Sequence, residues 1–331
     1  MSLPSSGQFL SSIRSSAASA TENANIRIDT GAVDVLLKSP AFASSFTRLS
    51  AGDTLPMPLN FPSVGDELNF FGILALLNFG SGYRLPLHRE TGRGAADTMK
   101  MLAMGMYLSD EVSATAIKSI SEAKIAELMG VKIHIERQHE TLPVVVGELG
   151  GAMYQLVKLV TSALNETGEI LLNGGYNDLG MFLYEILRTA RSDVDGIVER
   201  IVRALPAFRD MAVVDGHPIF CFKKALFLCK AISIRFGSAN PPPFPVPSTT
   251  SLPILSDNVV PSLLLHLRVI DMSASQQLAG ISMGTPGLEG LLGDAAGSSP
   301  ASAGQPTADA PVLSANQGVP SCVLRRSKHA R

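Results

Sequence analysis

One acidic residue in the segment "SLPILSDNVVPSLLLHLRVIDMS", Ser251–Ser273, is a candidate catalytic residue. Asp257 follows a proline-containing stretch and precedes an apolar run. A carboxylate held at the mouth of a pocket stabilises developing positive charge or acts as a base. Asp257 is also a good N-cap, with Pro261 tolerated in the first turn of the following helix. The apolar stripe of that helix, expected to be buried, comprises Leu263, Leu264, Leu267 and Ile270. Both interpretations stay open on residue types alone.

Basic residues supply the other candidate functional groups. Lys223 and Lys224 open an apolar helical stretch, where they are either solvent-facing or snorkelling side chains or ligands for an anion. The stretch "FGSGYRLPLHRETGRG" is predicted to be a glycine-rich loop that carries Arg84, His88 and Arg93. These cationic side chains are candidates for binding a phosphate group, on the basis of charge alone.

Metal chemistry and disulfides are not expected. His134 and His139 lie five residues apart, whereas ligands on one helix face are three or four apart. Neither "GSGYR" nor "GRGAAD" matches a phosphate-binding glycine motif. The chain has three cysteines, too few and too scattered for a disulfide framework or a zinc site. We therefore expect no metal and a reducing, cytoplasmic setting.

Composition limits the classes of partner. Of 331 residues, 46% are hydrophobic and 17% are charged, and the formal net charge is −2. Such a balance provides no broad electrostatic attraction to nucleic acid. The longest apolar run, Phe70–Gly80, is well short of the roughly 20 residues that a membrane helix needs. We expect neither nucleic acid nor a membrane as a direct partner.

The elements that position these residues are predicted to be mainly helical. Apolar residues recur at helical spacing through most of the chain, which predicts a mainly α, single helical domain. Asp215-Gly216 between two short β-prone runs predicts one small hairpin with a type I′ turn. The predicted boundaries are a flexible N-terminus at 1–17, the helical domain at 18–272 and a low-complexity disordered tail at 273–331.

Five segments, in order, resemble the queuosine salvage family. They are "ATENANIRIDTGAVDVLL" (Ala20–Leu37), "GDELNF" (Gly65–Phe70), "ALNETGEILL" (Ala163–Leu172), "LPAFRD" (Leu205–Asp210) followed by "GHPIFCFKKA" (Gly216–Ala225), and "LSDNVVPSLLLHLRVIDMS" (Leu255–Ser273). The similarity covers about residues 18 to 273. Although none of these motifs is decisive by itself, their order is difficult to produce by chance.

The resemblance implies a helical fold like that of DNA glycosylases and an enzyme that hydrolyses the N-glycosidic bond of queuosine 5′-phosphate, releasing queuine. Asp257 falls on the family's catalytic aspartate. Leu255, Asn258 and Lys223 are the expected substrate-binding residues. The reaction implies no cofactor, and the expected partner is the small nucleotide substrate.

Two departures from the family pattern leave a second function open. Leu255 stands where the family has an aromatic residue, so stacking on a flat base is lost. The usual C-terminal segment, rich in Asp and Tyr, is replaced by the low-complexity tail. The alternative is therefore a non-catalytic family member that binds a nucleobase or a protein partner. A glycosylase acting on nucleic acid would need the basic surface that the composition argues against.

Overall fold

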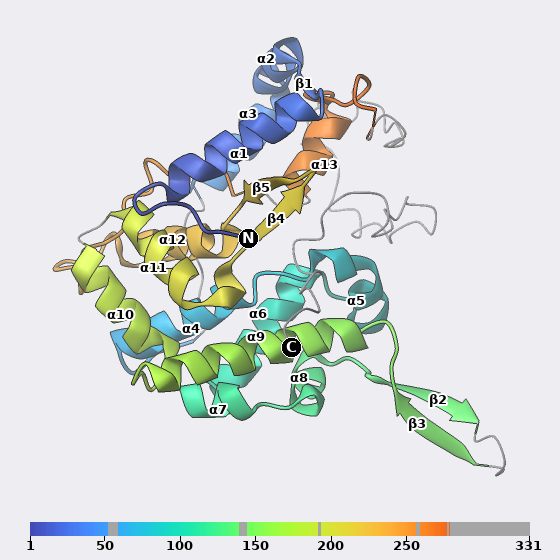
Figure 1. Ribbon diagram of the computed structural model, residues 1–331, viewed down its shortest axis with the longest axis vertical. Coiled ribbons are helices and arrows are strands. Elements are labelled where there is room, and N and C mark those ends of the chain that lie inside the picture. Colours follow the sequence, from blue (N-terminus) through green and yellow to red (C-terminus); the bar gives the residue numbers. More distant parts are fainter. Residues whose placement is uncertain (52–58, 139–143, 191–192, 256–258, 277, 279–331) are drawn as a thin grey trace.

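The chain forms a helical domain with short antiparallel strand pairs (Figure 1). The computed structural model describes residues 1–51, 59–138, 144–190, 193–255, 259–276 and 278. The helices are α1 (Phe9–Asn23), α2 (Thr30–Lys38), α3 (Pro40–Ala51), α4 (Val64–Leu76), η1 (Ser81–Tyr83), α5 (Arg84–Thr91), α6 (Ala95–Leu108), α7 (Ala114–Ser119), α8 (Glu122–Met129), α9 (Tyr154–Asn173), α10 (Leu179–Ala190), α11 (Val194–Ala204), η2 (Pro206–Phe208), α12 (Lys223–Phe236) and α13 (Val259–His266). The prediction of a mainly α, single helical domain is confirmed.

The strands form three pairs among the described residues, where the sequence predicted one hairpin. They are β1 (Arg27–Ile28) with β6 (Ile270–Asp271), β2 (His134–Gln138) with β3 (Val145–Leu149), and β4 (Met211–Val214) with β5 (His217–Phe220). The predicted turn between β4 and β5 is confirmed, because Asp215 and Gly216 have φ angles of 49° and 81°. Positive φ at both central residues is the mark of a type I′ turn.

Helix α4 lies at the centre of the hydrophobic core and packs against α6, α10 and α12. From Phe70 to Leu76 its sequence is apolar on every side, as is typical of a buried helix. Ser63 caps its start by accepting a hydrogen bond from the Asp66 backbone N–H at 3.2 Å. The long apolar run of the sequence is therefore a core helix. No helix among the described residues combines the length and apolar character needed to cross a membrane.

One buried amide fastens α4 to its neighbours. Asn69 accepts a hydrogen bond from the Leu179 backbone N–H at 3.2 Å and donates one to the Val112 carbonyl at 3.0 Å. Burial of an unpaired amide would be costly, so these two bonds fix how α10 and the end of the α6–α7 connection lie against α4. Asn69 thus has a structural role within the "GDELNF" motif.

Helices α4 and α12 run antiparallel, and an ion pair joins one end of the pair. The Arg235 side chain near the end of α12 donates to the Glu67 carboxylate near the start of α4. Because the two helices are antiparallel, the start of α12, directly after the β4–β5 hairpin, lies next to the end of α4. That junction carries the candidate site.

Two elements differ from the sequence predictions. Residues 84–91 form α5 instead of a loop, since Pro86 occupies the first turn of a helix, where its missing N–H costs nothing. Helix α13 ends at His266, and Arg268 with φ of 59° turns the chain into β6. Consequently the stripe predicted along one longer helix is only partly buried, and Leu263 is 50% exposed.

The packed region also extends across both predicted boundaries. Helix α1 begins at Phe9, and Phe9 and Ile13 are buried, although the sequence predicted a flexible segment at 1–17. At the other end Ser275 is buried, and the Asn25 side chain donates to the Ala274 carbonyl at 3.0 Å. The burial of these residues depends on partners that are distant in the sequence, and local composition does not indicate such partners. Most of the predicted tail lies outside the described residues.

The closest approach of α10 to α4 yields a first test. A Cβ added at Gly180 would lie 2.2 Å from the Gly65 carbonyl oxygen and 2.8 Å from the Asn69 backbone nitrogen. We expect Gly180→Ala to force the helices apart and to lower the free energy of unfolding by about 1–3 kcal/mol. Denaturant unfolding measures this change.

Gly82→Ala is the matched control, because no atom lies within 4 Å of a Cβ at that position. Its stability is expected to equal or slightly exceed that of the parent, since alanine restricts the unfolded chain. Equal stabilities for the two variants would contradict the close packing of α4 and α10.

Candidate functional site

The β4–β5 hairpin brings two of the sequence motifs together. Met211 pairs with Phe220, so the residues just outside the hairpin, Asp210 and Cys221, are neighbours. The Asp210 carbonyl accepts hydrogen bonds from the backbone N–H groups of Cys221 and Phe222, at 2.9 and 3.1 Å. The end of "LPAFRD" therefore lies against the beginning of "FKKA".

Asp210 and Lys224 form a buried ion pair at the start of α12. The Lys224 Nζ lies 3.6 Å from the Asp210 carboxylate and also donates to the Ala207 carbonyl. The other Asp210 oxygen accepts a hydrogen bond from the Lys224 backbone N–H at 2.9 Å. Burial raises the pKa of the Asp210 carboxyl above its usual value, while the Lys224 ammonium opposes the rise. Asp210 thus caps α12, which has no side-chain cap of its own, and neutralises a buried cation.

Arg209, which precedes Asp210, caps the C-terminal end of α11. Arg209 donates to the carbonyls of Val202 and Arg203, at 3.0 and 2.8 Å, in the last turn of α11. A cation at a helix C-terminus satisfies orphan carbonyls and complements the helix dipole. Arg209 and Asp210 therefore join the end of α11 to the start of α12, two helices that lie side by side (Figure 1).

Phe222 holds the first residue of α12 in place. Its φ of 44° lies in the left-handed region, which costs a bulky residue of the order of 1–3 kcal/mol. The buried ring compensates by packing against Phe9 and Phe220, with centroids 5.4 and 5.6 Å away. This conformation turns the chain sharply from β5 into α12 and determines where Lys223 points.

Lys223 and Lys224 both contact residues that follow the end of α4. Lys223 Nζ donates to the Asn78 side-chain oxygen at 3.2 Å. Lys224 Nζ lies 4.8 Å from the centroid of the adjacent Phe79 ring, a cation–π contact. A fixed ammonium group, an amide and a buried ion pair thus meet where α4 ends and α12 begins. This arrangement can orient an anionic or hydrogen-bond-accepting ligand beside Lys223.

The predicted site residues are described in part. Lys223 is half-buried at this junction. Leu255 is half-buried and packs against the hydrophobic core. Asp257 and Asn258 lie outside the described residues, between Leu255 and the start of α13, so their predicted roles stay predictions.

The solvent-facing or snorkelling interpretation of Lys224 is wrong. Its side chain is buried, with 7% of the residue exposed, and its ammonium group is held by Asp210. Of the other basic candidates, Arg93 has a structural partner, because its guanidinium donates to the Met129 carbonyl at the end of α8 at 3.2 Å.

Sequence reasoning missed Asn78 and Phe79 as partners of the lysines. A signal for Asn78 was present, since it is a polar amide at the end of the longest apolar run. The nearness of Asp210 to the start of α12 could also have been inferred, because extending the predicted hairpin register by one residue places Asp210 beside Cys221. Contacts with the end of α4, by contrast, depend on tertiary packing.

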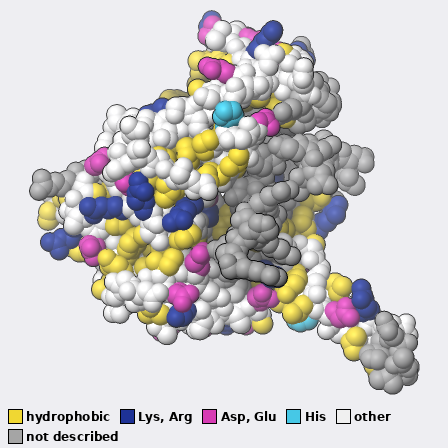
Figure 2. All heavy atoms as spheres, in the orientation of Figure 1, with side chains coloured by type: hydrophobic (Ala, Val, Ile, Leu, Met, Phe, Trp, Pro, Cys, Tyr) yellow, Lys and Arg dark blue, Asp and Glu magenta, His cyan; other side chains and the backbone are white. Residues whose placement is uncertain are grey.

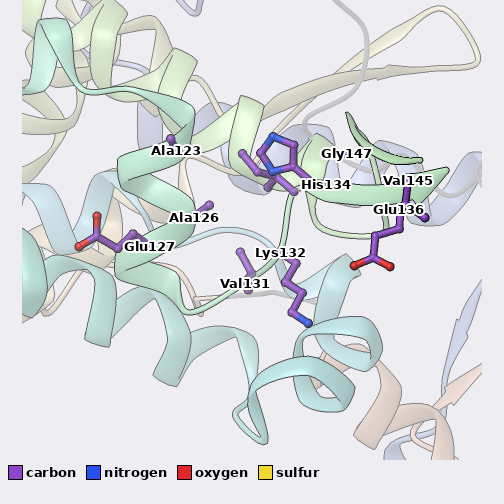
Figure 3. A pocket seen from close by; sticks show the side chains of 10 residues that line it. Ala123, Ala126, Glu127, Val131, Lys132, His134, Glu136, Val145 and Gly147 are labelled. Atoms are coloured by element: carbon purple, nitrogen blue, oxygen red, sulfur yellow. The ribbon is translucent and has the colours of Figure 1, made fainter. Parts of the chain in front are cut away.

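An open cavity of about 710 Å³ lies elsewhere, between α8 and the β2–β3 hairpin. Figure 3 shows Ala123 and Ala126 of α8 on one side and His134, Glu136 and Val145 of the hairpin on the other. Neither Lys223 nor Leu255 lines it. We therefore place the candidate site at the junction of α4 and α12, where the motifs meet, and not at this cavity.

These features define a helical protein in which "LPAFRD" and "FKKA" meet at one lysine-bearing junction. A family model described as queuosine salvage protein matches residues 108–280, just over half of the chain. The chain belongs to the queuosine salvage protein family, which indicates a role in queuosine salvage. None of the curated proteins compared with the chain matches it.

The buried ion pair yields a second test. Asp210→Asn leaves the Lys224 cation buried without its counter-charge, and we expect the free energy of unfolding to fall by about 3–5 kcal/mol. Asp210→Asn combined with Lys224→Met removes both charges and is expected to recover part of that loss. Denaturant unfolding of the three proteins measures the coupling between the two residues.

Glu169→Gln is the surface control, because Glu169 pairs with Lys118 across 3.9 Å with both side chains exposed. Removing that pair is expected to cost less than about 1 kcal/mol. If Asp210→Asn were as mild as Glu169→Gln, the ion pair would not stabilise the junction.

Proposed function

We propose that this protein is a hydrolase that cleaves the N-glycosidic bond of queuosine 5′-phosphate and releases queuine for tRNA modification. Family membership supports this proposal. The single observation that carries it is the convergence of the "LPAFRD" and "FKKA" motifs on the end of α4, where Lys223 is held by Asn78. Such convergence is expected of motifs that build one site.

We propose Asp257 as the catalytic residue. Cleavage of the glycosidic bond creates positive charge on the ribose ring, and a fixed carboxylate stabilises that charge or attacks the anomeric carbon. Water then supplies the oxygen that bonds to that carbon, and the base leaves with a proton on its nitrogen. A site that excludes bulk water strengthens the carboxylate's effect.

Lys223 is the proposed ligand of the substrate's anionic group. Its hydrogen bond to Asn78 restricts the ammonium position, which lowers the entropy lost when a substrate binds. Asp210 and Lys224 fix the start of α12 and so fix the backbone from which Lys223 extends. Asn78 and Asp210 are therefore proposed as positioning residues.

Leu255 and Asn258 are the proposed contacts for the base. Leucine provides apolar contact without aromatic stacking, and this residue is the observation that favours the second candidate, a non-catalytic member that binds a nucleobase or a protein partner. Retention of an aspartate at 257 favours the hydrolase. Within the part of the chain that the structure describes, Cys221 and Cys229 are not joined in a disulfide. We propose a cytoplasmic location, where cysteines are kept reduced.

Hydrolysis by an Asp257→Asn variant tests the catalytic proposal. Asparagine caps a helix as well as aspartate does, so this change removes the charge and keeps any capping role. We expect release of queuine from queuosine 5′-phosphate to fall by at least about 100-fold. Free base is quantified by chromatography, and circular dichroism verifies that the variant is folded.

Asp193→Asn is the matched control, because Asp193 caps α11 by accepting from the backbone N–H groups of Asp195 and Gly196. Its turnover is expected to equal that of the parent. A parent that binds queuosine 5′-phosphate without releasing queuine would favour the non-catalytic alternative and reject the hydrolase.

The role of Lys223 is tested with two substrates. Lys223→Gln keeps a polar side chain and removes the charge. We expect the KM for queuosine 5′-phosphate to rise about tenfold or more, as for loss of one charge-assisted hydrogen bond, with little change for unphosphorylated queuosine. Lys118→Gln on α7 is the surface control and is expected to leave both values unchanged. An equal effect of Lys223→Gln on the KM values of both substrates would show that Lys223 does not bind the phosphate group.

A further inference from the structure

Both strands of the β2–β3 hairpin are exposed. Figure 1 shows the hairpin extending outward beyond α8 and α9, and every residue of both strands is exposed except Val146, which is half-buried. In Figure 2 the same projection carries hydrophobic side chains next to charged ones. An isolated two-stranded hairpin is at best marginally stable in water, so a further strand would stabilise it.

The register shows which backbone groups face outward. His134 pairs with Leu149, and the Gly150 backbone N–H donates to the Ile133 carbonyl at 2.9 Å. Hydrogen-bonded and non-hydrogen-bonded pairs alternate along an antiparallel ladder. The backbone N–H and C=O groups of Val145, Gly147 and Leu149 therefore point away from β2. They form an edge on the outer side of β3 with which no other strand of the described residues pairs.

This edge lacks the features that usually protect a free strand. β3 has the sequence Val-Val-Gly-Glu-Leu, with no proline and no lysine. Val145 is 63% exposed and Leu149 is 54% exposed. Its one charge, Glu148, is already paired with Arg137 of β2 at 3.3 Å. Such an edge is suited to pairing with another strand.

We propose that the outer edge of β3 pairs with the same edge of a second copy of this chain, across a two-fold axis at Gly147, to form a continuous four-stranded sheet. In this antiparallel arrangement Gly147 faces the partner's Gly147, and Val145 faces the partner's Leu149. All three outward-facing residues then form main-chain hydrogen bonds. A two-fold axis at Val145 or Leu149 would engage only one end of the strand.

Charge and shape select this register. Gly147 at the axis has no side chain to obstruct the approach of the two backbones. Val145 and the partner's Leu149 form an apolar cross-strand pair, which symmetry repeats. Glu148 faces the partner's Val146, so no like charges are opposed. Pairing through the outer edge of β2 would instead place Glu136 opposite the partner's Glu136, which is unfavourable.

The cavity beside the hairpin is consistent with this arrangement. Val145 and Gly147 line it on the face that also bears the Leu149 side chain, because alternate residues share a face. The partner's Leu149, opposite Val145, would lie at the rim of this cavity. Pairing therefore covers apolar surface as well as satisfying backbone groups.

Sedimentation equilibrium over a wide range of protein concentration tests the proposal with the full chain. We expect the parent to shift from monomer to dimer as concentration rises. Val145→Lys places charge on the edge at two symmetric positions and is expected to weaken dimerisation about tenfold or more. Val213→Lys is the matched control, since Val213 is 55% exposed on the separate β4–β5 hairpin, and it is expected to dimerise like the parent. A parent that stays monomeric, or equal dimerisation of both variants, would overturn the proposal.

Crosslinking tests the register. A hydrogen-bonded pair has Cα atoms about 5.5 Å apart, within reach of a disulfide. Gly147→Cys is therefore expected to give a covalent dimer on mild oxidation. Val146→Cys is expected to give none above the parent's background, because the two Val146 positions are offset along the strands. Equal yields from the two variants, or none from Gly147→Cys, would reject a two-fold axis at Gly147.

Discussion

The ion pair between Asp210 and Lys224 is the interaction on which the candidate site depends. It lies at the open end of the β4–β5 hairpin, where the residues before β4 and after β5 are neighbours. The pair contacts η2, α12 and the end of α4. A buried charge pair contributes little net stability relative to apolar residues, but it allows few alternative arrangements. Its role here is to fix the position of one backbone, and Lys223 extends from that backbone.

Polar contacts complement this pair along α4, the helix at the centre of the hydrophobic core. Apolar packing holds α4 in the core, and directional polar bonds add to it. Glu67, Asn69 and Asn78 mark its start, middle and end, and each bonds to a different part of the chain. Since each bond satisfies a buried or half-buried polar group, any shift of α4 would break several of them at once. A rigid core helix thus forms one wall of the candidate site.

Local signals in the sequence predicted those parts of the fold that local interactions determine. The turn at Asp215-Gly216 and the mainly helical character of the chain agree with the structure. The burial of Lys224 and the end of α13 at His266 depend on partners distant in the chain, and helical periodicity does not reveal them. The roles of Leu255, Asp257 and Asn258 came from the family resemblance and remain predictions.

The pairing of β1 with β6 has a consequence for the order of folding during synthesis. Arg27 is made early, yet its strand partner Asp271 is made after almost all of the described chain. Helices α4 to α12 can pack while β1 still lacks its partner. The pairing must therefore form late, once the core has brought the two ends together and reduced the entropic cost of closing so long a loop. A chain truncated just before residue 270 would therefore keep the residues of the hydrophobic core and leave β1 without its strand partner.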